Sequence, residues 1–146
     1  MVSRRLVWTI VWIAAAAAAL AYLHDPPWLI DQTTGLRGWE QHAGEPRYRW
    51  SGGHASFFVR SDAAAIDVPI STTFDSGDAR PMLVTISVDD GIAARLILTD
   101  AAWRRVRVPL PAPAGRRVRR IDVRTNVTRE DNHGVRIGEV QIVPRG

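Results

Sequence analysis

The first apolar stretch of the chain is long and unbroken. The eighteen residues from Leu6 to Leu23 carry no charge and contain no proline or glycine. At 1.5 Å per residue, a helix over this stretch covers about 27 Å, close to the roughly 30 Å hydrocarbon core of a bilayer. Because the stretch is apolar on every face, a helix buried in a soluble domain fits it poorly. The pattern predicts one transmembrane helix within residues 1–23.

The charges on the two sides of this helix differ. Arg4 and Arg5 precede it, whereas no arginine follows it until Arg37. Because basic residues favour the cytoplasmic side, we expect a single-pass cell-membrane protein with a cytoplasmic N-terminus and an extracytoplasmic C-terminal domain. A cleaved signal peptide is the alternative, since residues 19–21 (Ala-Leu-Ala) fit a small-x-small cleavage pattern. The apolar run exceeds the about 7–15 residues of such peptides, which favours an uncleaved signal-anchor.

A short spacer follows the helix. Pro26 and Pro27 end the helix, because proline cannot continue it and restricts the residue before it. We assign residues 24–34 to the spacer and residues 35–146 to one domain. A spacer of roughly ten residues reaches at most about 35 Å, so the domain is expected to work close to the membrane surface.

From Gly35 onward the pattern changes to short apolar runs with a period of two, bounded by glycine, proline, aspartate and asparagine. About eight such runs at regular spacing predict an all-β, antiparallel β-sandwich with one apolar and one charged face on each sheet. Asp90-Gly91 predicts a hairpin turn, because glycine tolerates the positive φ that tight hairpins need. The change of phase at Gly138 predicts a β-bulge. The apolar positions of the alternation are Ile66, Val68, Ile70, Val84, Ile86, Val88, Leu96, Leu98, Val106, Val108, Leu110, Ile121, Val123, Val135, Ile137, Val140 and Ile142.

Composition narrows the classes of function. The chain has no cysteine, which excludes disulfides, thiolate zinc sites, thiol nucleophiles and a lipoprotein cysteine. All 19 basic residues are arginine, which we interpret as the codon usage of a GC-rich bacterial genome. The net charge is +4, and without the two arginines before the helix it falls to about +2. That is a weak field for nucleic acid, which is therefore not expected as a partner.

Several short blocks of the domain occur together in one known type of domain. Gly35, Trp39-Glu40 and residues 47–51 (Arg-Tyr-Arg-Trp-Ser) resemble the opening of jelly-roll accessory domains found on bacterial envelope glycosyltransferases and related membrane proteins. In those domains a Gly-x-x-x-Glu stretch precedes an (F/Y)-R-W-(T/S) strand. Similar blocks follow in the same order at Ile86–Gly91, Asp100–Trp103 and Asp131–Gly138, so the resemblance covers about Gly35 to Val143.

This resemblance implies a jelly-roll β-sandwich similar to carbohydrate-binding modules, with a role in glycan recognition or in scaffolding beside envelope-polysaccharide machinery. Two departures limit it. The family usually carries Arg-x-Leu before its closing Gly-Val, where this chain has Asn132-His133. The large multi-pass catalytic portion of the family is not part of this sequence, so no enzymatic function is carried over.

Glu40, Arg49 and Trp50 are the first candidate ligand-binding residues. A carboxylate, a guanidinium and an indole can pair with sugar hydroxyls and stack on a sugar ring. The alternative is structural, with Arg49 bridging to Glu40 and Trp50 packed in the core. In a strand Arg49 and Trp50 point to opposite faces, so they cannot both serve one sheet-face site. Trp103, at the start of a later strand, is a sugar platform if exposed and a core residue if buried.

The segment 103–124 contains eight arginines against one acid, Asp122. Arg105 and Arg107 share a face of their strand, and an antiparallel partner could place Arg120 and Arg124 beside them. Guanidinium groups suit phosphates and carboxylates, so anionic lipid headgroups or an acidic glycan are candidate ligands of Arg105, Arg107 and Arg124. A solvated outer face is the alternative.

Asp131 is the last candidate, in a loop with Glu130 and Asn132 whose oxygens suit Ca²⁺. The spacing matches no EF-hand, and Asp-Asn is also ordinary turn chemistry, so no metal or other cofactor is assigned. Residues 75–78 (Asp-Ser-Gly-Asp) are likewise predicted to form a turn.

No nucleophile and base occur in a supporting motif, so an enzyme is not expected. The leading hypothesis is a membrane-tethered, non-catalytic β-sandwich that recognises glycan or supports envelope-polysaccharide assembly. The alternative is a protein-interaction subunit of a larger membrane complex with no sugar site.

Overall fold

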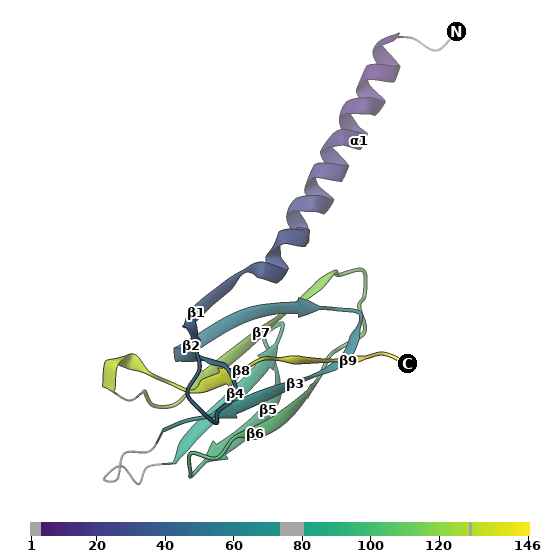
Figure 1. The fold of residues 1–146 in the computed structure, drawn as a ribbon. Helices are drawn as coiled ribbons and strands as arrows, with labels where there is room; N and C mark the ends of the chain where they lie inside the picture. Colours follow the sequence, from purple (N-terminus) through teal and green to yellow (C-terminus); the bar gives the residue numbers. More distant parts are fainter. Residues whose placement is uncertain (1–3, 74–80, 129) are drawn as a thin grey trace.

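A single long helix projects from a β-sandwich. The computed structural model describes residues 4–73, 81–128 and 130–146, so the turn predicted at residues 75–78 lies outside the described residues. Helix α1 (Arg4–His24) makes no buried contact with the sandwich and extends away from it (Figure 1). It is long and apolar enough to cross a membrane, a test that a signal sequence would also pass.

The junction between helix and sandwich is packed. Asp25 and Pro26 are buried, and the Asp25 carboxylate accepts a hydrogen bond from the backbone N–H of Arg117. A short 3₁₀-helix, η1 (Pro27–Asp31), follows and leads into the first strand. The helix therefore leaves the sandwich from a fixed point instead of a loose linker.

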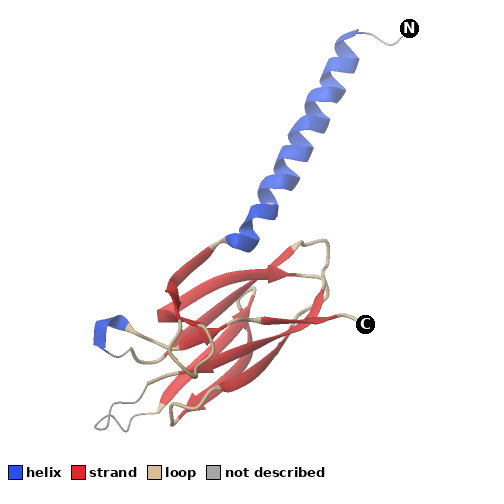
Figure 2. Ribbon diagram, in the orientation of Figure 1, coloured by secondary structure: helices blue, strands red, loops and turns tan. Residues whose placement is uncertain are grey.

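The sandwich consists of antiparallel strands in two layers (Figure 2). Hydrogen bonds connect them in the order β5-β4-β7-β2-β8-β3-β6, with β1 beside β2 and β9 beside β3. The long strand β2 connects the two layers. Its residues His54–Arg60 pair with β7 of one layer, and its residues Tyr48–Trp50 pair with β8 of the other. The elements are β1 (Thr33–Glu40), β2 (Tyr48–Arg60), β3 (Ala63–Ser71), β4 (Met82–Val88), β5 (Gly91–Leu98), β6 (Arg104–Pro109), β7 (Val118–Thr125), η2 (Glu130–Asn132), β8 (Arg136–Gly138) and β9 (Gln141–Pro144). The expectation of an all-β antiparallel sandwich is confirmed.

The core lies between the layers and follows the predicted alternation. Ile66, Val68 and Ile70 of β3 are fully buried, and the inward positions of β4 and β7 pack against them. Burial of a side chain of this size stabilises the fold by about 1.5–3 kcal/mol. Ile142, on the last strand, departs from the pattern, since about half of its surface is exposed (51%).

The hairpin between β4 and β5 is confirmed, but its turn residues are not those expected. Val88 pairs with Gly91, so the two-residue loop is Asp89-Asp90. These two residues carry the positive φ angles, 47° and 72°. A two-residue hairpin of this type needs positive φ at both central positions, and aspartate tolerates it because its short side chain can bond locally.

The phase change at Gly138 is a β-bulge that separates two short strands on the same edge of β3. Ile137 pairs with Ile70 and Gln141 pairs with Asp67, so three residues of this segment stand opposite two of β3. The strand stops at Gly138, and Gln141 starts a new one that also pairs with β3. A Cβ on Gly138 would lie 3.0 Å from Pro69 Cβ, so the residue permits close packing of β8 on β3.

The expected pairing within segment 103–124 is wrong. Strand β6, which carries Arg105 and Arg107, pairs with β3, whereas β7, which carries Arg120 and Arg124, pairs with β2 and β4. The intervening turn joins the two layers instead of closing a hairpin. The arginines therefore form two separate groups.

Candidate functional site

The outer face of the β2-β8-β3-β6 layer carries aromatic and charged side chains. Trp50 pairs with Arg136, and Arg136 pairs with Ser71, so these three residues share one face. Tyr48 is on the same face, two positions before Trp50 on β2. Ile137, between the outward positions of β8, points into the core.

Arg136 is the centre of this face, with only 5% of its surface exposed. Its guanidinium donates two hydrogen bonds to the Glu45 carboxylate, at 2.9 and 2.8 Å, and one to Ser71 Oγ at 2.8 Å. It also lies over the rings of Tyr48 and Trp103, 5.2 and 5.1 Å from their centroids. Such a desolvated cation over aromatic faces is worth about 2 kcal/mol or more.

The aromatic rings around Arg136 pack against one another. Tyr48 meets Trp50 edge to face at 6.0 Å, and its hydroxyl lies 2.7 Å from His42 Nδ1. Burial, followed by the nearby Glu40 carboxylate, raises the pKa of Tyr48 above its ordinary value. Tyr48 and Trp50 are buried. These rings therefore support the surface instead of presenting a face to a ligand.

A groove opens on this face beside the Arg136 cluster, and we call it the Trp103 groove. Its volume is about 360 Å³. Trp103 is only partly buried and forms one wall. Around the indole stand three guanidinium groups, one carboxylate and one carboxamide. The lining residues are Pro46, Arg47, Pro69, Trp103, Arg104, Arg105, Glu139 and Gln141.

A second groove, the Trp39 groove, lies under β1 and is mostly apolar. Its volume is about 450 Å³. Trp39 is 43% exposed, and the guanidinium groups of Arg47 and Arg49 lie 4.8 and 5.5 Å from its ring centroid. The lining residues are Ile30, Thr33, Leu36, Trp39, Arg49, Phe57, Phe58, Ile137, Gly138, Glu139 and Val140.

The two grooves meet at one ion pair. Glu139 lines both of them, and its carboxylate lies 3.8 Å from Arg47 Nη1. Arg47 lines the Trp103 groove and also covers the ring of Trp39. About half or more of both side chains is exposed, at 52% and 67%. A pair as long and exposed as this contributes little to stability and can open for a ligand.

The structure brings three of the candidate residues to these grooves. Trp103 and Arg105 line the Trp103 groove, and Arg49 lines the Trp39 groove. The structural alternative required an ion pair between Arg49 and Glu40, and these two side chains do not form one. Its Nε donates to the carbonyl of Arg37 at 2.6 Å, whereas Glu40 accepts from the Tyr48 hydroxyl at 3.4 Å.

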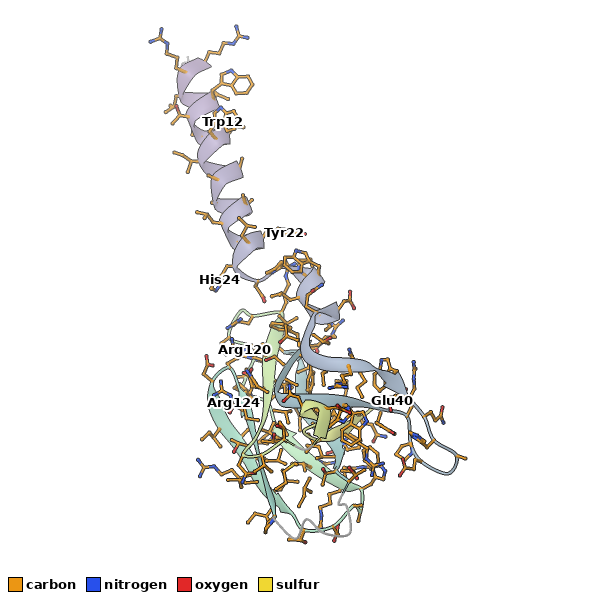
Figure 3. All side chains as sticks on the ribbon, turned by 90° about the vertical axis from the view of Figure 1, so that its left-hand side faces the viewer. Trp12, Tyr22, His24, Glu40, Arg120 and Arg124 are labelled. Atoms are coloured by element: carbon orange, nitrogen blue, oxygen red, sulfur yellow. The ribbon has the colours of Figure 1, made fainter. Side chains whose placement is uncertain are left out.

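Trp50, Arg107, Arg124 and Asp131 do not line either groove. Trp50 is buried, with its ring centroid 4.6 Å from that of His133. Arg107 makes two hydrogen bonds of 2.9 Å to Asp67. These bonds hold the pKa of Asp67 below its ordinary value. Figure 3 shows Arg124 on the flank of the sandwich opposite to Glu40.

Asp131 lies in the exposed loop predicted from the sequence. Its φ is +59°, and its backbone carbonyl accepts a hydrogen bond from Arg37. Among the residues that the structure describes, no group of three or more histidine, cysteine, aspartate or glutamate side chains could hold a metal ion.

Sequence reasoning missed Arg47, Glu139, Gln141 and Arg136. Arg47 belongs to the block 47–51, but nothing in that block separates it from its neighbours. Glu139 and Gln141 follow Gly138, and the bulge predicted there was the only local signal near them. Arg136 occupies an outward position of the alternation and was therefore expected to face solvent.

A serine, a histidine and an aspartate also meet on the outer face of the other layer. Asp122 is buried and its Oδ1 lies 2.6 Å from Ser56 Oγ and 3.0 Å from His54 Nε2. In a hydrolase triad the histidine stands between the other two residues and uses both ring nitrogens. Here Ser56 and Asp122 both approach the same nitrogen of His54, at 3.4 and 3.0 Å. This cluster is not arranged to activate the serine.

Comparisons with known proteins match the fold only. No family model and no curated protein sequence matches the chain. A family 35 carbohydrate-binding module from Clostridium thermocellum superposes with a TM-score of 0.52 and 9% identity over 78% of this chain and 92% of that one. A family 35 carbohydrate-binding module from an environmental isolate superposes with a TM-score of 0.50 and 14% identity, over 77% of this chain and 88% of that one. The salicylyl-acyltransferase SsfX3 from a tetracycline biosynthetic pathway gives 0.50 and 14%, over 77% of this chain but only 36% of that chain. The chain thus has the curled antiparallel jelly-roll fold of such carbohydrate-binding modules.

Proposed function

We propose that this chain is a membrane-tethered, non-catalytic module that recognises glycan through the Trp103 groove. The observation that carries the proposal is the composition of that groove, with a partly exposed indole surrounded by arginine, glutamate and glutamine side chains. The C–H face of a sugar stacks on an indole, and its hydroxyls pair best with charged and amide groups. The jelly-roll likeness to carbohydrate-binding modules supports the same role.

The charge of the groove favours an acidic glycan. Arg47, Arg104 and Arg105 face one carboxylate, Glu139. Asp100 pairs with Arg104 at 2.8 Å and offsets part of this charge. Guanidinium groups bind carboxylate and phosphate in a bidentate manner. Sugars that carry uronate or phosphate groups are therefore the expected ligands, as the components of an envelope polysaccharide.

The proposed tether is an uncleaved α1 with its N-terminus in the cytoplasm. Support comes from the arginines at residues 4–5 and from Asp25, which fixes the end of the helix to the sandwich. We expect the mature protein to keep residues 1–23 and to remain in the membrane after carbonate extraction. Mass spectrometry of the purified chain checks this, and a mature chain that begins near Tyr22 would show a cleaved signal peptide.

The glycan site is tested by binding to the full chain in a polyoxyethylene detergent, because detergents with sugar headgroups would compete. A panel of neutral, uronate-containing and phosphorylated oligosaccharides is titrated by calorimetry. The wild type is expected to prefer the acidic sugars, and Trp103→Ala and Arg105→Glu to weaken binding at least about tenfold, which corresponds to 1.4 kcal/mol. Trp28→Ala and Arg95→Glu change exposed residues outside the groove and should bind like the wild type. Absence of binding to the whole panel would contradict the proposal.

The second candidate function is a protein-interaction subunit. Leu83 pairs with Ile97, and both are exposed with Ile92 on the outer face of β4 and β5. Exposed apolar side chains that share a face are typical of a contact surface. Loss of a copurifying membrane complex in Ile97→Arg, with no loss in Trp103→Ala, would favour this function over the first.

A further inference from the structure

The two grooves differ in chemistry although they adjoin. The Trp103 groove is ringed by charged and amide groups. The Trp39 groove is lined by apolar side chains, among them Leu36, Phe57 and Val140. Its volume of about 450 Å³ lies in the range of small-molecule sites. One ligand that filled both grooves would need a polar part and an apolar part.

The apolar groove lies at the membrane end of the sandwich. Ile30 of η1 forms part of its wall, and η1 begins three residues after α1 ends. Figures 1 and 3 show that the chain enters β1 directly below the helix. The hydrogen bond from the Arg117 N–H to Asp25 holds this end of the sandwich beside the end of the helix. If α1 spans the bilayer, hydrocarbon tails are the most abundant apolar ligands near this groove.

Cationic groups stand where the two grooves meet. Arg47 contacts the Trp39 ring and pairs weakly with Glu139, and the Arg49 guanidinium also lies within 5.5 Å of the centroid of that ring. A phosphate would bind Arg47 more strongly than the distant, exposed carboxylate does, since bidentate guanidinium–phosphate bonds are short and charge-assisted. The expected order along a bound ligand is therefore apolar tail, anionic group and polar headgroup.

We propose that the ligand is an anionic glycolipid, in which a sugar is joined through a phosphate to a hydrocarbon tail. The sugar occupies the Trp103 groove, the phosphate contacts Arg47 at the junction, and the tail occupies the Trp39 groove. This inference rests on the proposed glycan function and names the class of glycan carrier. The module then holds the headgroup of a membrane lipid instead of a soluble polysaccharide.

The test uses the full chain in phosphatidylcholine nanodiscs that contain a small fraction of a photoreactive lipid. Three probes share one tail with a terminal diazirine: a glucosyl phosphate ester, a glucoside without phosphate, and phosphatidylcholine. After illumination, mass spectrometry locates the adducts. All three probes should label α1, which shows that the tail reaches the protein. Only the glucosyl phosphate ester is expected to label residues 33–40 and 137–143, at least about fivefold above the other two.

Two groove variants, each with a control variant, test whether the labelling depends on the groove residues. Arg47→Glu and Trp103→Ala should each lower the labelling of the groove at least threefold, whereas their controls, Arg95→Glu and Trp28→Ala, should not. Equal groove labelling by all three probes would show a site for any tail and would overturn the proposal. Absence of groove labelling, while soluble acidic sugars still bind at Trp103, would overturn the glycolipid inference and leave the glycan function standing. Absence of soluble-sugar binding would instead contradict the proposed function itself.

Discussion

Replacing Arg136 with leucine is expected to lower the free energy of unfolding by about 3–5 kcal/mol, as removal of one partner of a buried ion pair does. Arg136 is 5% exposed, and its guanidinium bonds to Glu45 and Ser71. Its loss leaves the Glu45 carboxylate unpaired in a partly buried position and removes the cation over the Tyr48 and Trp103 rings. Urea unfolding of the full chain in detergent, followed by tryptophan fluorescence, measures the change.

The control for this variant is Arg95→Leu, an exposed position on β5 that should change stability by no more than about 0.5 kcal/mol. A double-mutant cycle with Glu45→Ala separates the ion pair from the packing of the rings. We expect a coupling energy of about 0.5–3 kcal/mol between Glu45 and Arg136. An Arg136→Leu chain within 1 kcal/mol of the wild type would mean that the cluster is incidental to the fold.

The core strands could be predicted because burial on a strand follows a local period. Ile66, Val68 and Ile70 alternate with polar or small residues, and each is fully buried whichever strand lies beside it. The partner of a strand is a different matter, since it depends on contacts between residues far apart in sequence. Arg105 and Arg120 are close in the chain but belong to different layers, because β6 pairs with β3 and β7 with β2.

The buried polar residues could not be predicted by the same rule. Asp67, Asp122 and Arg136 all occupy outward positions of their strands, where alternation predicts exposure. They are buried because distant side chains cover them, Arg107 over Asp67 and Glu45 with the aromatic rings around Arg136. The period of a strand fixes which face a residue is on, but only the tertiary structure decides whether that face is covered.

The candidate site could be predicted only in part, because its residues come from strands whose pairing the sequence does not show. Residue type alone suggested Trp103 and Arg105, since an indole and a guanidinium suit a sugar. Glu139 and Arg47 come from separate segments, and only the pairing of β2 with β8 and of β8 with β3 brings them to the same groove. The junction between a polar and an apolar groove is therefore visible in the structure but not in the sequence.

The second large loss of stability is expected when Asp122 on β7 is replaced. Burial alone would raise the pKa of Asp122, but hydrogen bonds from Ser56, His54 and Arg120 outweigh it and hold the pKa below its ordinary value. The Arg120 Nε donates at 2.9 Å to the oxygen that His54 and Ser56 do not use. Asp122→Asn cannot accept all of these bonds, so we expect a loss of about 1–3 kcal/mol at pH 7.

The stabilisation by the Asp122 carboxylate is expected to depend on pH. A carboxylate with a lowered pKa in the folded state stabilises the fold fully above its unfolded pKa of about 3.9, and this contribution is lost as the pH falls through the folded pKa. The difference in stability between wild type and Asp122→Asn should therefore shrink below about pH 4. Asp62→Asn, at an exposed pair with Arg60, is the control and should change stability little. A deficit of Asp122→Asn that stays unchanged at pH 3 would show that packing, not the charge of Asp122, stabilises this face.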